Sequence, residues 1–281
     1  MESLRDIKNR KIATEKTAQI TKAMNMVSAS KLRRTEKIYK QYRDYLERIA
    51  NCVANIASNA TCDHPMLVQR EIKKVAYIMI TSDRGLAASY NSNVYKRITE
   101  EISKCPTDYV IGAIGRKGYT YCMKNGYNLT SDEAILVRDD LQFADIMPLS
   151  SQLINDYKAG LIDKIVVCYN HYVNTLTQEV VLKTILPVEK PEIKEKMVDY
   201  EYDQGVERTL DLVLPMYVEN VLYGLILDAK TSEHASRMTA MKNATDNATD
   251  VISQLQLIYN RARQASITKE LTDIIGGANA V

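Results

Sequence analysis

Residues 238–266 read MTAMKNATDNATDVISQLQLIYNRARQAS and contain neither glycine nor proline. Apolar and small residues recur in this stretch at alternating spacings of three and four, which is the pattern of a coiled-coil seam. The seam positions are Met238, Met241, Thr245, Ala248, Ile252, Leu255, Tyr259, Ala262 and Ser266. Several of them are small, so a second backbone can approach closely. The stretch therefore predicts a long helix packed against another helix.

Two breaker-free ends extend this prediction to both termini. Residues 1–64 and 225–275 contain no glycine or proline, although the chain has 10 glycines and 6 prolines. In a helix, Gly costs about 1 kcal/mol and Pro about 3 kcal/mol relative to Ala, so we expect long helices at the ends. Residues 205–214 are expected to form separate turns, with the long C-terminal helix running from Pro215, because proline starts or kinks helices.

The N-terminal helix has its own apolar periodicity. Ser3 and Asp6 form a candidate capping box at its start. The face predicted from spacing contains Ile20, Met24, Val27, Ile38, Tyr42, Tyr45, Ile49, Val53 and Ile56. We expect the terminal helices, residues 1–62 and 205–281, to pair antiparallel as a coiled coil, with residues 63–204 as a globular head between them.

The head alternates between short β-branched runs and helical stretches, which predicts a Rossmann-like α/β fold. The connection to the final strand is too short for a parallel crossover, so this strand should pair antiparallel at an edge of a mostly parallel sheet. The predicted strands are Lys74–Thr81, Tyr109–Ile114, Lys164–Tyr169 and Gln178–Leu186. The predicted helices are Tyr90–Lys104, Arg116–Asn125 and Phe143–Lys158, and Lys190–Lys196 is expected to be a linker.

Composition narrows the class of protein. The chain has 281 residues, of which 46% are hydrophobic and 26% charged, ordinary values for a protein with a buried core. Its apolar runs are far shorter than the roughly 20 residues of a membrane span, and its N-terminus lacks the features of a signal or transit peptide. The 5 cysteines include no CxxC pair, so reduced thiols and a cytosol-facing soluble protein are expected.

Candidate chemistry is sparse. The three histidines, His64, His171 and His234, show no ligand spacing, so no metal site is expected. Glycines 112, 115 and 118 follow a predicted strand and open a helix, where a phosphate can bind backbone N–H groups. Their spacing matches neither phosphate-binding motif, and a tight turn with close helix–sheet packing is the favoured interpretation. The turn at Thr81–Gly85 offers one Asp beside an Arg but no accompanying nucleophile, base or metal ligand, so we expect no catalytic site and no cofactor.

Positive charge is concentrated at the N-terminus. Residues 1–60 hold 13 Lys and Arg against 6 Asp and Glu, a net charge of +7 in a chain whose total is +2. Three interpretations stay open: nucleic-acid contact, a solvated helix face, or a surface that meets acidic loops of a protein partner. The basic residues in question are Lys31, Arg33, Arg34, Lys37, Lys40 and Arg43.

The C-terminal end is apolar, small and uncharged apart from its carboxylate. Its residues are Ile274, Ile275, Gly276, Gly277, Ala278, Asn279, Ala280 and Val281. Exposed tails are usually polar and frayed, so this end either inserts into an apolar environment or frays.

Five stretches carry a family resemblance. They are NRKIATEKTAQITKAMNMVSASKLRRTE (Asn9–Glu36), SDRGL (Ser82–Leu86) with Asn91, IGRKG (Ile114–Gly118), EHASRMTAMKNATDNA (Glu233–Ala248) and QASITKELTDIIGGANA (Gln264–Ala280). In this order they resemble the γ subunits of F-type ATP synthases along the whole chain. Ala87 and Ala88 depart from the Cys-Gly or Gly-Gly usual in the family after SDRGL. A bacterial chain is favoured, since neither a chloroplast-type insertion nor a transit peptide is present.

The resemblance implies a rotor. In this family the paired terminal helices form a shaft inside a ring of three α and three β subunits. The head sits with the ε subunit and the membrane c-ring, so that ion flux drives ATP synthesis, or hydrolysis drives ion pumping. It further implies a non-catalytic, peripheral protein on the cytoplasmic face of the bacterial inner membrane, without membrane insertion or nucleic-acid binding.

The resemblance also implies roles for particular residues. Met24 and the basic side of the N-terminal helix, with Lys31, would meet an acidic loop of β. Arg237 and Gln264 would face β loops that catch the rotor, and Thr268 and Glu270 belong to the same network. The tip formed by Ile274, Ile275, Gly276, Gly277 and Ala278 would turn in an apolar sleeve. A nucleotide-using enzyme on the head and a coiled-coil nucleic-acid-binding or scaffold protein remain the alternatives.

Overall fold

The computed structural model describes residues 3–58, 64–104, 107–189 and 205–278. The predicted linker Lys190–Lys196 lies outside them. The chain forms two compact units. The helix-pair unit comprises Met1–Ala29 and Arg237–Val281, and the head unit comprises Ser30–Ser236. Helices α1 (Leu4–Ser58) and α5 (Val206–Ala278) each run through both units.

The start of α1 is capped as predicted. The Asp6 backbone N–H donates to Ser3 Oγ at 3.2 Å, and the Ser3 N–H donates to Asp6 Oδ2 at 3.3 Å. The prediction for the start of α5 is wrong, because α5 begins at Val206 and continues through Pro215. Leu214 and Val218, which flank the proline, are fully buried in the head core. We attribute the continuous helix to this burial, which offsets the roughly 3 kcal/mol that an internal proline costs.

The sheet of the head unit has the order β2-β1-β3-β4. Strand β1 (Lys74–Ile80) pairs in parallel with β2 (Asp108–Ile114) and with β3 (Lys164–Tyr172). The edge strand β4 (Gln178–Leu186) pairs antiparallel with β3. The predicted mixed sheet with an antiparallel edge strand is therefore confirmed.

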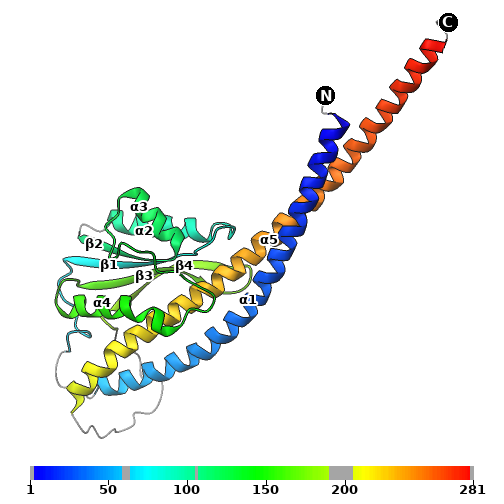
Figure 1. Ribbon diagram of the computed structural model, residues 1–281. Coiled ribbons are helices and arrows are strands. Elements are labelled where there is room, and N and C mark those ends of the chain that lie inside the picture. The colour runs from blue at the N-terminus through cyan, green and yellow to red at the C-terminus, as the bar shows by residue number, and fades with distance from the viewer. Residues whose placement is uncertain (1–2, 59–63, 105–106, 190–204, 279–281) are drawn as a thin grey trace. The chain divides into compact units, whose positions relative to one another are not determined.

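Helices cover both faces of this sheet (Figure 1). One face carries α2 (Tyr90–Lys104) and α3 (Arg116–Asn125), whose core includes Val94, Ile98 and Cys122. The other face carries α4 (Met147–Lys158), preceded by the short 3-10 turn Phe143–Asp145, together with parts of α1 and α5. That larger core includes residues 210–229 of α5, so this helix is partly a core element of the head.

Helix α5 also contains an apolar window long enough by composition to cross a membrane, with a mean hydropathy of 1.5. Half of this window is buried inside the protein. The core helix of a protein can reach the same hydropathy without crossing a membrane.

The turn between β2 and α3 shows why glycines stand there. Gly115 has φ +97°, and a Cβ atom on it would lie 2.2 Å from the Thr81 carbonyl oxygen. A Cβ atom on Gly118 would lie 2.7 Å from Thr81 Oγ1. The favoured interpretation of these glycines, close helix–sheet packing, is confirmed.

Gly115→Ala should therefore destabilise the head by about 2–4 kcal/mol, through positive-φ strain and overpacking together. Gly126→Ala is the matched control, since Gly126 also has a positive φ of +67° but has no atom within 4 Å of a built Cβ. The control should lose only about 1 kcal/mol. Denaturant unfolding of both variants measures the difference, and equal losses would show that contact with Thr81 is not the cause.

In the helix-pair unit the two helices run antiparallel. Lys11 Nζ donates to Gln256 Oε1 at 2.6 Å, and Thr21 Oγ1 lies 2.8 Å from Thr245 Oγ1. Asn25 Nδ2 donates to the Met238 carbonyl oxygen at 2.7 Å. As residue numbers rise along α1, those of its partners on α5 fall, which defines the antiparallel register.

The seam predicted on α5 agrees with the burial of its side chains. Met241, Ala248 and Leu255 are buried, and the other six seam positions are half-buried. Between Ile20 and Tyr45 of α1 the predicted face is wrong, because four of its members are exposed: Ile20, Val27, Ile38 and Tyr45. Thr21, Ser28, Leu32 and Thr35 are buried instead. The three hydroxyl residues among them, Thr21, Ser28 and Thr35, recur every seven positions. We attribute their burial to a close approach of the neighbouring helix.

Candidate functional site: the exposed surfaces of the helix-pair unit

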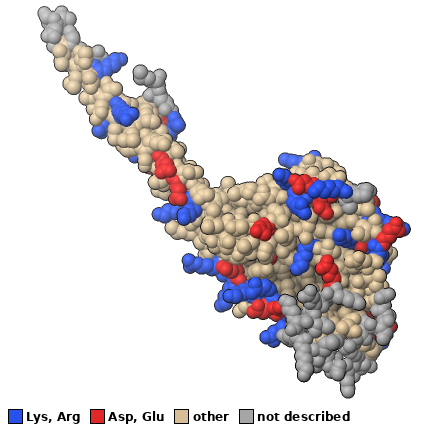
Figure 2. Space-filling model, turned by 180° about the vertical axis from the view of Figure 1, so that it is seen from behind, with Lys and Arg blue, Asp and Glu red and all other residues tan. Residues whose placement is uncertain are grey.

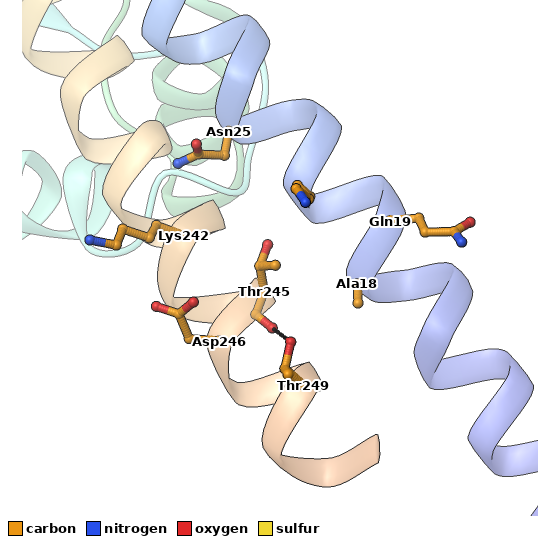
Figure 3. A pocket seen from close by; sticks show the side chains of 8 residues that line it. Ala18, Gln19, Asn25, Lys242, Thr245, Asp246 and Thr249 are labelled. Atoms are coloured by element: carbon orange, nitrogen blue, oxygen red, sulfur yellow. Dashed lines mark hydrogen bonds between the residues drawn. The ribbon is translucent and has the colours of Figure 1, made fainter. Parts of the chain in front are cut away.

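A shallow groove of about 410 Å³ lies between α1 and α5 in the helix-pair unit (Figure 3). Small side chains create it, since Ala18 on α1 and Thr245 and Thr249 on α5 leave space between the backbones. Gln19, Lys22 and Asn25 line it from α1, and Lys242 and Asp246 line it from α5. Seven of the eight residues that line it have polar side chains, with charges of both signs, so this part of the helix pair resembles a contact surface more than an apolar ligand pocket.

The residues expected to contact partners differ in exposure. Met24 is half-buried on α1, one position before Asn25 of the groove, and Arg237 is buried with 9% of its surface exposed. Gln264, Thr268 and Glu270 are exposed on α5. The helix periodicity places Gln264 and Thr268 on one face and Glu270 on the opposite side.

The end of α5 is a helix exposed on every side. All side chains described between Ile267 and Ile275 are exposed, including Leu271 at 54%, Ile274 at 67% and Ile275 at 60%. By extension of the register set by Lys11 and Gln256, the first residues of α1 are level with about residue 264 of α5. Gly276, Gly277 and Ala278 continue the helix to its end. Four large apolar side chains, Ile267, Leu271, Ile274 and Ile275, are therefore left uncovered on this part of the helix.

Lys31, which was expected to meet a partner, has a partner within its own chain. Its Nζ lies 2.6 Å from Asp139 Oδ2 in the head unit. His234 Nε2 and Lys230 Nζ lie 3.5 Å and 4.0 Å from Asp139 Oδ1. Burial raises the pKa of Asp139, but the hydrogen bond and charge of Lys31 outweigh it and lower the pKa overall. The carboxylate thus stays ionised and links α1 to α5.

Metal binding and thiol chemistry find little support among the described residues. In the part of the chain that the structure describes, no cluster of three His, Cys, Asp or Glu side chains is suited to hold a metal ion. Burial raises the pKa of Cys122 to about 11 and that of Cys168 to about 12, so both thiols stay protonated near neutral pH.

The phosphate-binding alternative at the start of α3 also fails on geometry. The Arg116 N–H donates to Asp83 Oδ1 at 2.9 Å, and the Gly118 N–H donates to Thr81 Oγ1 at 2.8 Å. The Lys117 N–H donates to the Ser82 carbonyl oxygen. In a phosphate-binding loop, such backbone donors would bind the phosphate. Here the turn that follows β1 accepts their hydrogen bonds and places the Asp83 carboxylate among them.

Basic residues do not form a continuous stripe on the face shown in Figure 2, where Lys and Arg are interspersed with Asp and Glu. A nucleic-acid-binding face is normally a patch of one sign. The charge distribution on this face therefore favours a solvated or protein-contacting surface.

Two features of these surfaces were not predicted from the sequence. The hydroxyl residues of the α1 seam carry no hydrophobic signal, although their seven-residue recurrence was available as a clue. The link from Asp139 to Lys31 and Lys230 joins residues about 90–110 positions apart, and no local pattern indicates such a pairing.

Comparison with known proteins gives one consistent result. The sequence model of the family described as ATP synthase matches residues 3–281. The ATP synthase gamma chain of Macrococcus caseolyticus is 45% identical, and the alignment covers 100% of both chains.

Solved structures share the fold at lower identity. A chain of the Euglena gracilis mitochondrial ATP synthase, in the structure of its OSCP/F1/c-ring part, has a TM-score of 0.70 at 21% identity, with 99% of this chain and 94% of that chain covered. A chain of the central stalk and c-ring structure of the Tetrahymena thermophila mitochondrial enzyme has a TM-score of 0.59 at 22% identity, covering 80% and 99%.

Proposed function

This chain belongs to the family of ATP synthase gamma subunits, and from that premise we propose that it is the rotor of the central stalk, which couples ion-driven rotation to ATP synthesis. The reverse process, ion pumping driven by ATP hydrolysis, uses the same part. The observation that carries the proposal is the pair of long helices that are continuous between the head unit and the helix-pair unit. The chain transmits work, and the nucleotide chemistry belongs to other subunits.

The finer architecture follows from the same premise. We infer that the antiparallel helices of the helix-pair unit wind as a coiled coil, because the α5 seam keeps its alternating spacing of three and four. The head is a Rossmann-like fold without its ligand-binding parts. Its three parallel strands support this, and so do the backbone donors of α3, which bind the preceding turn in place of a phosphate.

An asymmetric shaft changes the state of its surroundings through unequal contacts. Only contacts that differ between two conformations shift an equilibrium between them, and a 10⁴-fold shift requires about 5.5 kcal/mol. Gln264 and Thr268 face one side of α5 while Glu270 faces the other. Such a helix presents different groups to each member of a surrounding ring.

We propose that the ring of three α and three β subunits contacts Met24, Lys31, Arg237, Gln264, Thr268 and Glu270. The exposure of Gln264, Thr268 and Glu270 supports their part directly. Lys31 would have to share its charge with Asp139, and the buried Arg237 would contact a partner only through its small accessible edge. The tip, Ile274 to Ala278, would turn in an apolar sleeve, where the lack of strong directional bonds keeps friction low.

The remaining partners are the ε subunit and the membrane c-ring, which the head unit would meet. The location is peripheral, on the cytoplasmic face of the bacterial inner membrane. Burial of half of the apolar window of α5 supports a helix that stays out of the bilayer.

Rotation of this chain inside the assembled complex is the direct test. With the ring immobilised, a bead attached to the head unit should turn on addition of ATP. The isolated chain should neither bind nor hydrolyse ATP in calorimetry. A complex that hydrolyses ATP while the bead stands still, or an isolated chain that hydrolyses ATP by itself, would refute the proposal.

Gln264→Leu tests the contact surface. The side chain is exposed, so the stability of the isolated chain should change by less than about 0.5 kcal/mol. In the complex, loss of an amide hydrogen bond worth about 1–3 kcal/mol should slow coupled turnover roughly tenfold. Gln254→Leu is the matched control, an exposed glutamine nearer the head on the same helix. Turnover at the wild-type rate in Gln264→Leu would count against the assignment.

A further inference from the structure

One segment of α5 is buried on all sides. The twelve residues Gly224–Ala235 are all buried, which amounts to more than three turns of helix. Four of them are ionisable, namely Asp228, Lys230, Glu233 and His234. We call this segment the socket segment. Charged groups are almost never fully buried unless they are paired, so their presence requires an explanation.

Asp228 accepts hydrogen bonds from the end of strand β3. The Tyr172 backbone N–H donates to Asp228 Oδ1 at 2.9 Å, and His171 Nδ1 lies 2.6 Å from Oδ2. Burial raises the pKa of Tyr39 on α1, and the negative charge of Asp228 adds to this rise. The same charge acts in the same direction on the buried Tyr169 of β3, whose pKa is also raised. One buried side chain thereby ties α5 to the sheet and acts electrostatically on the other long helix.

Other polar contacts leave the socket segment in different directions. Tyr90 at the start of α2 donates its hydroxyl to the Ala229 carbonyl oxygen at 2.9 Å. Lys230, which is 3% exposed, donates to the Arg138 carbonyl oxygen and lies near Asp139. Residues 228 and 230 are about 200° apart on a helix, so the bonds hold the segment from opposite sides.

The kind of interaction matters for a rotor. Apolar burial is non-directional, so a purely apolar helix is held in its rotational position only by the shape of its packing. Hydrogen bonds depend steeply on angle and distance, and buried ion pairs add little net stability. A buried ring of directional bonds therefore fixes the rotational position and the height of the helix more than it adds free energy.

We propose that the socket segment is the joint that passes torque between the head and the shaft, with Asp228 and Lys230 as its positioning residues. This inference rests on the proposed rotor function. The Asp228 network resists rotation of α5 relative to β3, and Lys230 resists it relative to the loop at residues 138–139. Burial on all sides confines this part of the helix, and the polar contacts fix its rotational position.

The test uses the complete ATP synthase that contains this chain, with the ring immobilised. A bead is attached to the head unit at Leu161→Cys, an exposed position, with Cys52, Cys62 and Cys105 replaced by serine and the buried Cys122 and Cys168 kept. The angular variance of the bead during catalytic pauses is inversely proportional to torsional stiffness. We expect Asp228→Ala to raise this variance at least twofold while the pause lengths at saturating ATP stay within twofold of wild type. Asp228→Asn, which keeps an acceptor for the Tyr172 N–H, should be intermediate.

The matched control is Ile98→Ala, which opens a cavity on the far face of the sheet, away from the socket segment. It should lower the melting temperature similarly but leave the variance unchanged. Unchanged variance in Asp228→Ala, or equal broadening in the control, overturns the proposal. If Asp228→Ala does not assemble, His171→Ala decides in its place, since His171 is 39% exposed in its side chain and should still broaden the variance measurably. A wild-type bead that never rotates would refute the rotor function itself, which is a distinct outcome.

Discussion

Leu255→Asp is expected to separate the helices of the helix-pair unit and to abolish coupled ATP synthesis. Leu255 is 4% exposed at a seam position of α5. A carboxylate there would lose its hydration without gaining a partner of opposite charge, and an unpaired buried charge costs several kcal/mol. Most of the stability of a helix in a protein comes from packing of its apolar face, so both helices should lose helicity in this unit.

The control for this experiment is Leu257→Asp, the same substitution two residues further on. Leu257 is 60% exposed, so the isolated chain should keep its helicity at 222 nm. Circular dichroism of the isolated chains measures the loss of helix, and the ratio of ions pumped to ATP hydrolysed measures coupling in the complex. Normal helicity and coupling in Leu255→Asp would show that the seam does not hold the shaft together.

Local patterns predict the α5 seam and the strands because those elements bury apolar residues. Met241, Ala248 and Leu255 follow helical spacing, and the parallel strands are continuous apolar runs, as expected for strands covered on both faces. The same search for apolar periodicity selects the wrong face of α1 between Ile20 and Tyr45. Ile20 and Val27 satisfy the periodicity, but they are exposed.

Close packing explains the residues that are buried instead. Thr21 and Thr35 keep their hydroxyl groups satisfied, since Thr21 bonds Thr245 and the Ala18 carbonyl oxygen and Thr35 bonds carbonyl oxygens of its own helix. Short side chains whose polar groups are internally satisfied allow two helices to approach without an apolar signal in the sequence. Sequence reasoning that counts only apolar residues misses such a seam.

Tertiary context also overrides the rule that proline ends a helix. Pro215 is tolerated inside α5 because the residues on either side of it belong to the core. The Asp228 network is a stronger case. Its hydrogen-bonded members come from β3 and α5, and nothing in either segment identifies the other. The candidate contact residues, Gln264 among them, are identified by family resemblance alone, and what the structure adds is which of them are exposed and which are buried.

The second large effect concerns the head unit, where Asp163 joins the starts of β1 and β3. Asp163 Oδ2 accepts hydrogen bonds from the N–H groups of Lys73 and Lys74 at 2.9 and 3.0 Å, and Arg70 Nε lies 2.8 Å from Oδ1. Asp163→Ala leaves these donors unsatisfied and a half-buried guanidinium unpaired. The expected loss is about 3 kcal/mol of unfolding free energy. Asp108→Ala, which removes an exposed carboxylate 3.7 Å from Lys74 at the same edge of the sheet, should cost less than about 0.5 kcal/mol.

The pH dependence of the head's stability provides an independent measurement of the same group. Burial would raise the pKa of Asp163, but the two backbone N–H groups and Arg70 together hold it below its ordinary value. Because the folded-state pKa is the lower one, the stabilisation is complete above the unfolded pKa of about 3.9 and is lost as the pH falls through the folded pKa. As the pH is lowered from about 5 to about 2, the free energy of unfolding measured in urea should therefore fall less steeply for Asp163→Ala than for wild type. A side chain that has been removed cannot contribute a loss of stability on protonation. If the stability of Asp163→Ala falls as steeply as that of wild type, protonation of Asp163 is therefore not what destabilises the head.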